Sequence, residues 1–234
     1  MPQTIIHLQF GEAFHKAIEF DLSKKSELKG GIQIHKEKQV QEMKEVFLMN
    51  FKKSMFLPEE EKKFEELVVT GLKMVELYFK ELPRLEELYS IKTGESEVWL
   101  KANLKEPFTG EEMKIETFGK ADRITSDERI IEFKTSAGKW NEDDIKTKWQ
   151  TMFYGWFHYQ LKGRHPKSIT YLIFTKQKTP QLQIIDVSYL KEDYSKLFEE
   201  CKNIINKVEL GVYSRPEVFH PNYCDCFKFE NALK

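Results

Sequence analysis

Residues 122–135 read DRITSDERIIEFKT, which is two short β-rich runs on either side of a turn signal. Side chains two residues apart in a strand share a face, so Glu132 and Lys134 project together while the apolar residues between them face the other way. Asp122 lies on the preceding strand of the predicted hairpin, where its carboxylate can converge with that of Glu132. Two carboxylates at one point repel each other and favour a cation, so the hairpin predicts an oxygen-liganded Mg²⁺ or Mn²⁺ site beside a lysine.

The same three residues also have a purely structural interpretation. Asp122, Glu132 and Lys134 can form a ladder of ion pairs across the surface of a hairpin, an arrangement that contributes little to stability. On the hairpin alone this interpretation is the simpler one. A functional interpretation therefore depends on the rest of the chain.

The patterns outside the hairpin alternate between helix and strand. Apolar spacing predicts helices at 5–22, 35–53, 58–82, 143–161 and 190–210. Short β-rich runs predict strands at 97–104, 113–124, 129–135, 168–175 and 182–187. The three consecutive strands in the middle of the chain predict an antiparallel meander.

Composition restricts the class of protein. With 234 residues, 40% of them apolar, the chain can bury one large core. No apolar run approaches the ~20 residues that span a bilayer, three cysteines cannot build a disulfide framework, and the first residues lack the features of a signal peptide. We expect a cytoplasmic protein with no membrane partner, folded as a single domain over 1–234 with a helical insertion at 24–92.

Charge is unevenly distributed, although the net charge is only −1. Residues 145–185 contain no Asp or Glu. A locally basic segment indicates an anionic partner, and chance clustering on a solvated surface is the alternative. The candidate nucleic-acid contacts in this segment are Lys146, Lys148, Lys162, Arg164 and Lys167.

Four motifs stand in order along the chain. The first is a helix with a histidine, FGEAFHKAIEF, and the second is a Gly-x-x-Asp strand ending at Asp122. The third is the strand IIEFKT, and the fourth is a Gln-x-x-x-Tyr helix from Gln150 to Tyr154. Together they resemble the RecB-like branch of the PD-(D/E)XK nuclease superfamily. The resemblance covers about residues 10–22 and 97–187.

The resemblance implies a restriction-endonuclease-like α/β core, with a central mixed β-sheet flanked by helices and an N-terminal helical insertion. It also implies metal ligation by His15, Asp122, Glu132 and the backbone carbonyl of Phe133. Lys134 would be the catalytic lysine.

Three further residues take a role from the same resemblance. Gln150 and Tyr154 stand at i and i+4 on one helix face, and in the family such residues contact the active-site region and the substrate strand. Glu97 resembles an acidic residue that often opens the first strand in this branch, where it supports the ligands. As a charged residue at the start of an edge strand it also has an ordinary structural explanation.

The implied activity is a Mg²⁺- or Mn²⁺-dependent DNA nuclease that leaves 5′-phosphate and 3′-hydroxyl ends. We expect an exonuclease of DNA repair, recombination or mobile-element DNA processing, acting on single strands or duplex ends. One alternative is a non-catalytic DNA-binding or scaffolding protein of the same fold. Another is a nuclease subunit that is active only with a helicase or recombination partner.

The cysteines depart from those of many relatives. The CRISPR adaptation nucleases and the AddB-type subunits hold an iron–sulfur cluster through four cysteines, whereas this chain has only Cys201, Cys224 and Cys226. No iron–sulfur cluster is therefore expected. A zinc site formed by His220, Cys224 and Cys226 is an alternative to free thiols, but it is short of a tetrahedral ligand set.

Overall fold

The structure is a computed structural model that describes residues 3–24, 32–53, 56 and 60–212. Its elements in chain order are α1 (Gln3–Ser23), α2 (Ile32–Asn50), α3 (Glu61–Tyr89), β1 (Glu95–Ala102), β2 (Thr117–Ile124), β3 (Arg129–Ser136), α4 (Glu142–Lys146), α5 (Trp149–Lys162), β4 (Ser168–Thr175), β5 (Leu182–Val187) and α6 (Lys191–Glu209). Within these ranges, no helix combines the length and apolar character that crossing a bilayer demands.

The strands form one mixed sheet in the order β1-β2-β3-β4-β5. The first three pair antiparallel, which confirms the predicted meander. β3 and β4 pair in parallel, and β4 pairs antiparallel with β5. The parallel pair needs a crossover connection, which α4 and α5 supply. This mixed sheet with flanking helices confirms the predicted restriction-endonuclease-like α/β architecture.

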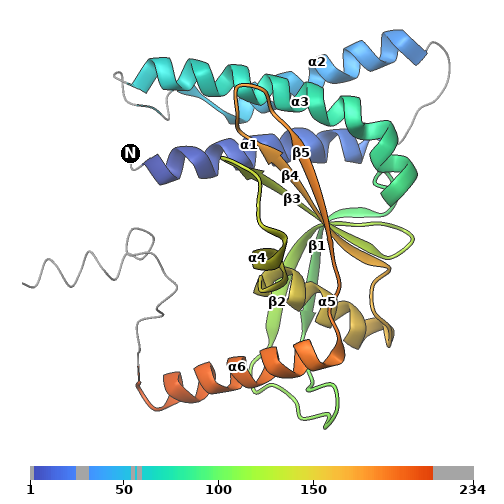
Figure 1. Cartoon of the computed structure of the whole chain (residues 1–234), viewed down its shortest axis with the longest axis vertical. Coiled ribbons are helices and arrows are strands. Elements are labelled where there is room, and N and C mark those ends of the chain that lie inside the picture. Colours follow the sequence, from blue (N-terminus) through green and yellow to red (C-terminus); the bar gives the residue numbers. More distant parts are fainter. Residues whose placement is uncertain (1–2, 25–31, 54–55, 57–59, 213–234) are drawn as a thin grey trace, which may run out of the picture.

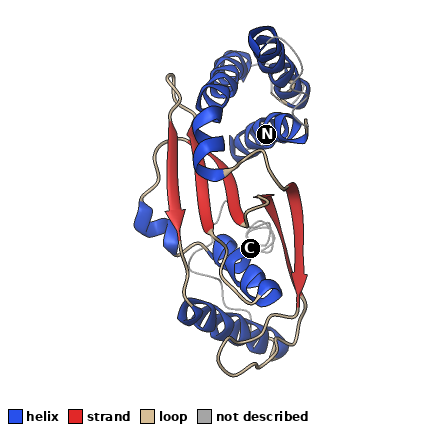
Figure 2. Ribbon diagram, turned by 90° about the vertical axis from the view of Figure 1, so that its right-hand side faces the viewer, coloured by secondary structure: helices blue, strands red, loops and turns tan. Residues whose placement is uncertain are grey.

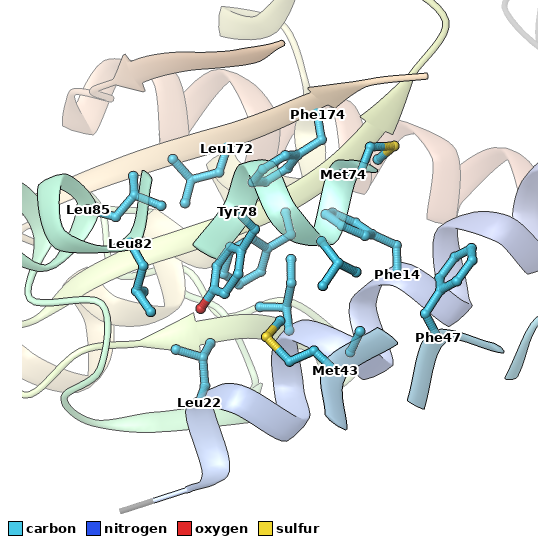
Figure 3. Packing of buried hydrophobic residues seen from close by; sticks show 14 of the residues in the cluster. Phe14, Leu22, Met43, Phe47, Met74, Tyr78, Leu82, Leu85, Leu172 and Phe174 are labelled. Carbon is cyan, nitrogen blue, oxygen red and sulfur yellow. The ribbon is translucent and has the colours of Figure 1, made fainter. Parts of the chain in front are cut away.

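Two hydrophobic cores lie on opposite faces of the sheet. Helices α1, α2 and α3 gather at one end of the molecule, and α5 and α6 gather at the other (Figures 1 and 2). Leu172 and Phe174 of β4 pack into the first core, where Phe14 and Tyr78 approach them from α1 and α3 (Figure 3). The alternate β4 residues face the second core, among them Ile173. β4 is apolar on both faces because it is covered on both.

The predicted single helix at 143–161 is wrong, because the chain breaks it into α4 and α5. The Asn141 side chain caps α4, and Lys148 is extended just before α5 begins. Ile145 and Thr151 are both fully buried. In one continuous helix their side chains would point about 120° apart, so the break allows both to face the interior.

Among the other boundaries, two differ most from the prediction. α3 was predicted to stop before Pro83, but it continues to Tyr89. Leu85 and Tyr89 are buried beyond the proline, and their burial, worth about 1.5–3 kcal/mol each, offsets the ~3 kcal/mol cost of proline inside a helix. β2 begins at Thr117 rather than at Met113, because the residues before it belong to a loop.

That loop, between β1 and β2, is organised around Glu106. Its carboxylate accepts backbone hydrogen bonds from Phe108 at 2.8 Å and Thr109 at 2.5 Å, and its side chain is 5% exposed. Burial raises the pKa of Glu106, but hydrogen bonds from Ser195, Thr109 and Phe108 outweigh that effect and lower it to about 2. Glu106 therefore holds the turn of its own loop in its ionised form.

We expect Glu106→Ala to lower the free energy of unfolding at pH 7 by about 2 kcal/mol, the usual contribution of hydrogen bonds to a charged group. Because folding lowers this pKa from 4.5 to about 2, the contribution of Glu106 is complete above pH 4.5 and disappears as the pH falls towards 2. Urea denaturation across that range measures both effects. The exposed Glu112→Ala is the control, and equal losses in the two variants would contradict the role of Glu106.

Candidate active site

The site lies where β2 and β3 separate. The two strands pair only next to their turn, through Arg123 with Ile131 and Ile124 with Ile130. At the next residue of β2, a side chain replaces the backbone pairing. The Asp122 carboxylate oxygen Oδ2 accepts a hydrogen bond from the backbone N–H of Phe133 at 2.8 Å. The separation leaves a gap in the sheet with a carboxylate inside it.

α1 brings His15 to this gap. A Cβ on Gly11 would lie 3.3 Å from the Thr135 hydroxyl, so the absence of a side chain lets α1 approach β3 closely. Gly11 therefore serves as a packing contact between α1 and β3. One turn later, His15 Nδ1 lies 3.7 Å from Asp122 Oδ2. The predicted meeting of these two side chains thus occurs in the structure.

A chain of hydrogen bonds connects β3 to α5. Lys134 Nζ donates to Glu132 Oε1 at 2.6 Å and to Gln150 Oε1 at 3.1 Å. Gln150 Nε2 donates to the Tyr154 hydroxyl at 2.9 Å. The Tyr154 hydroxyl donates in turn to the Lys120 carbonyl at 2.6 Å, which returns the chain to β2. These contacts hold the Lys134 ammonium in one position.

Gly119 makes room for this network. A Cβ at that position would come within 3.0 Å of the Tyr154 ring, so the glycine of the Gly-x-x-Asp motif allows the ring to lie against β2. The motif therefore has a packing role in addition to placing Asp122.

A cavity of about 590 Å³ opens over the gap between the strands. His15, Asp122 and Lys134 line it, and so does the predicted supporting residue Glu97, whose carboxylate pairs with Lys120. His7, Lys16, Lys120 and Lys176 also line the cavity, although none of them was among the predicted site residues, and so do the acids Glu12 and Glu19. A signal existed for His7, because it precedes Gly11 and His15 at helical spacing on the same face of α1.

Burial shapes the acid–base properties of the site. It raises the pKa of Glu132, and the nearby Asp122 charge adds to the effect while Lys134 opposes it. Burial also raises the pKa of Asp122 against the opposing effects of His15 and Lys134. The pKa of His15 is lowered by burial, so its imidazole favours the neutral form. Two carboxylates that ionise reluctantly and a neutral imidazole suit a bound cation.

The fit to a divalent metal has one argument for it and one against it. Glu132 Oε2 is buried and has no hydrogen-bond partner in the described part of the chain, which leaves a carboxylate oxygen free for a cation. Yet across those same residues no three His, Cys, Asp or Glu side chains form a ready-made metal group. The Glu132 carboxylate accepts a hydrogen bond from Lys134 and does not form a three-residue cluster with His15 and Asp122. Mg²⁺ requires only one or two protein carboxylates, so the donor set still fits.

The predicted basic surface divides into two groups. Lys146 and Lys148 precede α5, near Gln150, whereas the other three residues lie at the far end of this helix, about 20 Å away. Two of those three are already paired. Arg164 binds Glu128, and Lys167 binds Asp127 at 2.7 Å, both in the turn between β2 and β3. The structure therefore does not bring the five residues together.

The cysteine predictions are only partly covered. Cys201 lies on α6 as a free thiol packed against the second core, and burial raises its pKa to about 11. Cys224, Cys226 and His220 lie outside the described residues.

Comparisons with known proteins agree with the fold. The family model of the PD-(D/E)XK nuclease superfamily matches residues 2–227. A crystal structure from Eubacterium rectale, named "Putative exonuclease", is 21% identical, covers 89% of this chain and 77% of its own, and has a TM-score of 0.51. At that identity the likeness shows the fold alone. A second structure, SSO0001, is 16% identical over 91% of both chains, with a TM-score of 0.39. No curated protein matches the chain.

Proposed function

This chain belongs to the PD-(D/E)XK nuclease superfamily, and on that premise we propose that it is a metal-dependent deoxyribonuclease. Its products would carry 5′-phosphate and 3′-hydroxyl ends, and its action would be exonucleolytic, in DNA repair, recombination or mobile-element DNA processing. The observation that carries the proposal is the gap between β2 and β3, where the buried carboxylate of Glu132, the partly buried carboxylate of Asp122 and a positioned lysine adjoin a cavity lined by both lysines and acids.

His15, Asp122, Glu132 and the Phe133 carbonyl are the proposed holders of the metal, with Mg²⁺ or Mn²⁺ as the ion. When bound, such an ion polarises the scissile phosphate and lowers the pKa of an attacking water. Glu132 would have to turn its carboxylate from Lys134 towards His15 and Asp122 to join them. Its unpartnered Oε2 leaves one oxygen available for that purpose.

The side chains of this site then have distinct tasks. Lys134 carries a point charge beside the reacting groups, where it can orient the water or stabilise charge on the phosphate. Gln150 and Tyr154 keep its ammonium in place through the hydrogen-bond chain from α5. Lys176 attracts the phosphates of the strand into the cavity, and Lys16 and Lys120 join it when they exchange their partners Glu19 and Glu97 for phosphate.

The test is a cleavage assay with linear, circular, single-stranded and double-stranded DNA labelled at either end. We expect cleavage in Mg²⁺ or Mn²⁺, none in EDTA, and full recovery when the metal is restored. Release of labelled nucleotides from linear but not circular DNA would support an exonuclease. Equal cleavage in EDTA and in Mn²⁺ would overturn the proposal.

Two alternatives predict other outcomes in the same assay. A DNA-binding or scaffolding protein of this fold would bind the labelled DNA without cutting it, but every proposed ligand and the lysine are present in this chain. A subunit that depends on a helicase or recombination partner would bind metal yet cut slowly alone. Independently of this assay, we also propose that residues 1–234 form one nuclease-fold domain with a helical insertion at 24–92. The first core, shared by α1, α2, α3 and the sheet, supports that assignment.

A further inference from the structure

The outer face of the hairpin formed by β1 and β2 carries two exposed aromatic rings. Trp99 is 66% exposed and Phe118 is 68% exposed, and their ring centroids lie 6.2 Å apart. Leu100 and Ala121, from the same two strands, are buried on the opposite face, against the second core. Large rings are normally buried, so a pair left in solvent on a well-packed hairpin indicates a binding surface.

Lysines alternate with these rings. The strand register places Trp99 opposite Lys120 and Lys101 opposite Phe118. The two rings are therefore diagonal neighbours on this face, and so are the two ammonium groups. Lys120 Nζ lies 5.8 Å from the centre of the Trp99 ring. Lys101 is paired with Glu116 at 2.9 Å, but both side chains are at least half exposed, and such a pair exchanges readily for a phosphate. We call Trp99, Lys101, Phe118 and Lys120 the hairpin platform.

The platform is continuous with the cavity of the candidate active site. Lys120 belongs to both, and Asp122 follows it two residues later on β2. Glu97, two residues before Trp99, lines the same cavity and has a left-handed backbone with φ 55°, an uncommon conformation for a residue other than glycine. A strand lying along the platform would therefore lead into the gap between β2 and β3.

We infer that the hairpin platform binds single-stranded DNA and guides it to the cleavage site. Unpaired bases can stack on Trp99 and Phe118, while Lys101 and Lys120 contact the phosphates between them. A duplex cannot use such rings in this way, because its bases already stack on one another. The guiding of DNA towards the cavity rests on the proposed nuclease function. Beyond that function, the inference adds a binding site and a preference for single strands.

The experiment measures binding without cleavage. Fluorescence anisotropy in EDTA compares fluorescein-labelled oligo(dT) with a blunt duplex of equal length, using the full chain. We expect the Trp99→Ala, Phe118→Ala double variant to bind oligo(dT) about 10-fold or more weakly, with little change for the duplex. Trp99→Phe keeps a ring and should retain most of the affinity. Phe108→Ala, which removes another exposed ring from the loop of the same hairpin, is the control.

A cleavage readout separates binding from chemistry. In Mn²⁺ the double variant is expected to raise KM on single-stranded DNA and leave kcat nearly unchanged, because the platform does not touch the reacting groups. Unchanged oligo(dT) affinity, or equal losses on both DNAs, would overturn the inference. The inference would also be overturned if the wild type is a dimer, the double variant is a monomer and DNA binding is the same in both. The exposed face would then be the contact between two copies of the chain. If the wild type cuts nothing, the proposed function fails while the EDTA measurement still decides the platform.

Discussion

Glu132→Gln and Asp122→Asn are each expected to lower metal-dependent cleavage by about 1000-fold. The reason is loss of a carboxylate that would hold the ion, which supplies several kcal/mol of transition-state stabilisation. The folded state should survive both changes. Glu132 Oε2 has no hydrogen-bond partner in the described structure, so a neutral amide at that position removes a buried charge without removing a contact from that oxygen. Initial rates in Mn²⁺ and thermal unfolding curves measure the two effects.

Metal binding measured by calorimetry distinguishes the causes. Both variants should bind Mn²⁺ more weakly than the wild type, in proportion to their loss of activity. The control is Glu112→Gln, which removes a carboxylate from the exposed loop between β1 and β2 and should change neither value. Inactive variants with wild-type Mn²⁺ affinity would show that Asp122 and Glu132 do not hold the metal.

Local features of the chain were predictable from the sequence. The alternation in IIEFKT assigned Glu132 and Lys134 to one face, and the structure places the Lys134 ammonium 2.6 Å from the Glu132 carboxylate. The runs that became β4 and β5 were located at their observed bounds, because both are rich in β-branched and other apolar residues. Residue patterns alone did not place His15 beside Asp122. That expectation came from the resemblance to a family.

Tertiary features were not predictable in this way. The gap between β2 and β3 depends on how far two strands pair, and no local pattern encodes that length. The acid-free segment was read as one basic surface, but α5 separates its two groups, and the acids that pair with Arg164 and Lys167 come from an earlier turn. The alternation along β1 and β2 shows that Trp99 and Phe118 lie on one face of the hairpin, but it does not show whether that face is buried or exposed. Only the packing of the hairpin in the structure shows that the two rings are exposed.

Lys134→Met is expected to lower cleavage by about 100- to 1000-fold, the usual effect of removing one preorganised charge or donor at a reacting centre. Its effect on metal binding should have the opposite sign to that of the carboxylate variants. The Lys134 ammonium donates to Glu132 at 2.6 Å, so it competes with a cation for the same carboxylate. Without the lysine, the carboxylate is released and Mn²⁺ should bind as tightly as in the wild type or more tightly.

This combination of lost activity with retained metal is specific to a lysine that acts on the substrate. Lys134→Arg should not restore the rate, because a planar guanidinium cannot occupy the position between Glu132 and Gln150 that the compact ammonium fills. Lys139→Met removes an exposed lysine from the loop after β3 and is the matched control. If Lys134→Met loses Mn²⁺ together with activity, the lysine serves to keep Glu132 in place. If it loses neither, the hairpin carries only the ladder of ion pairs that its sequence also allows, and catalysis must lie elsewhere.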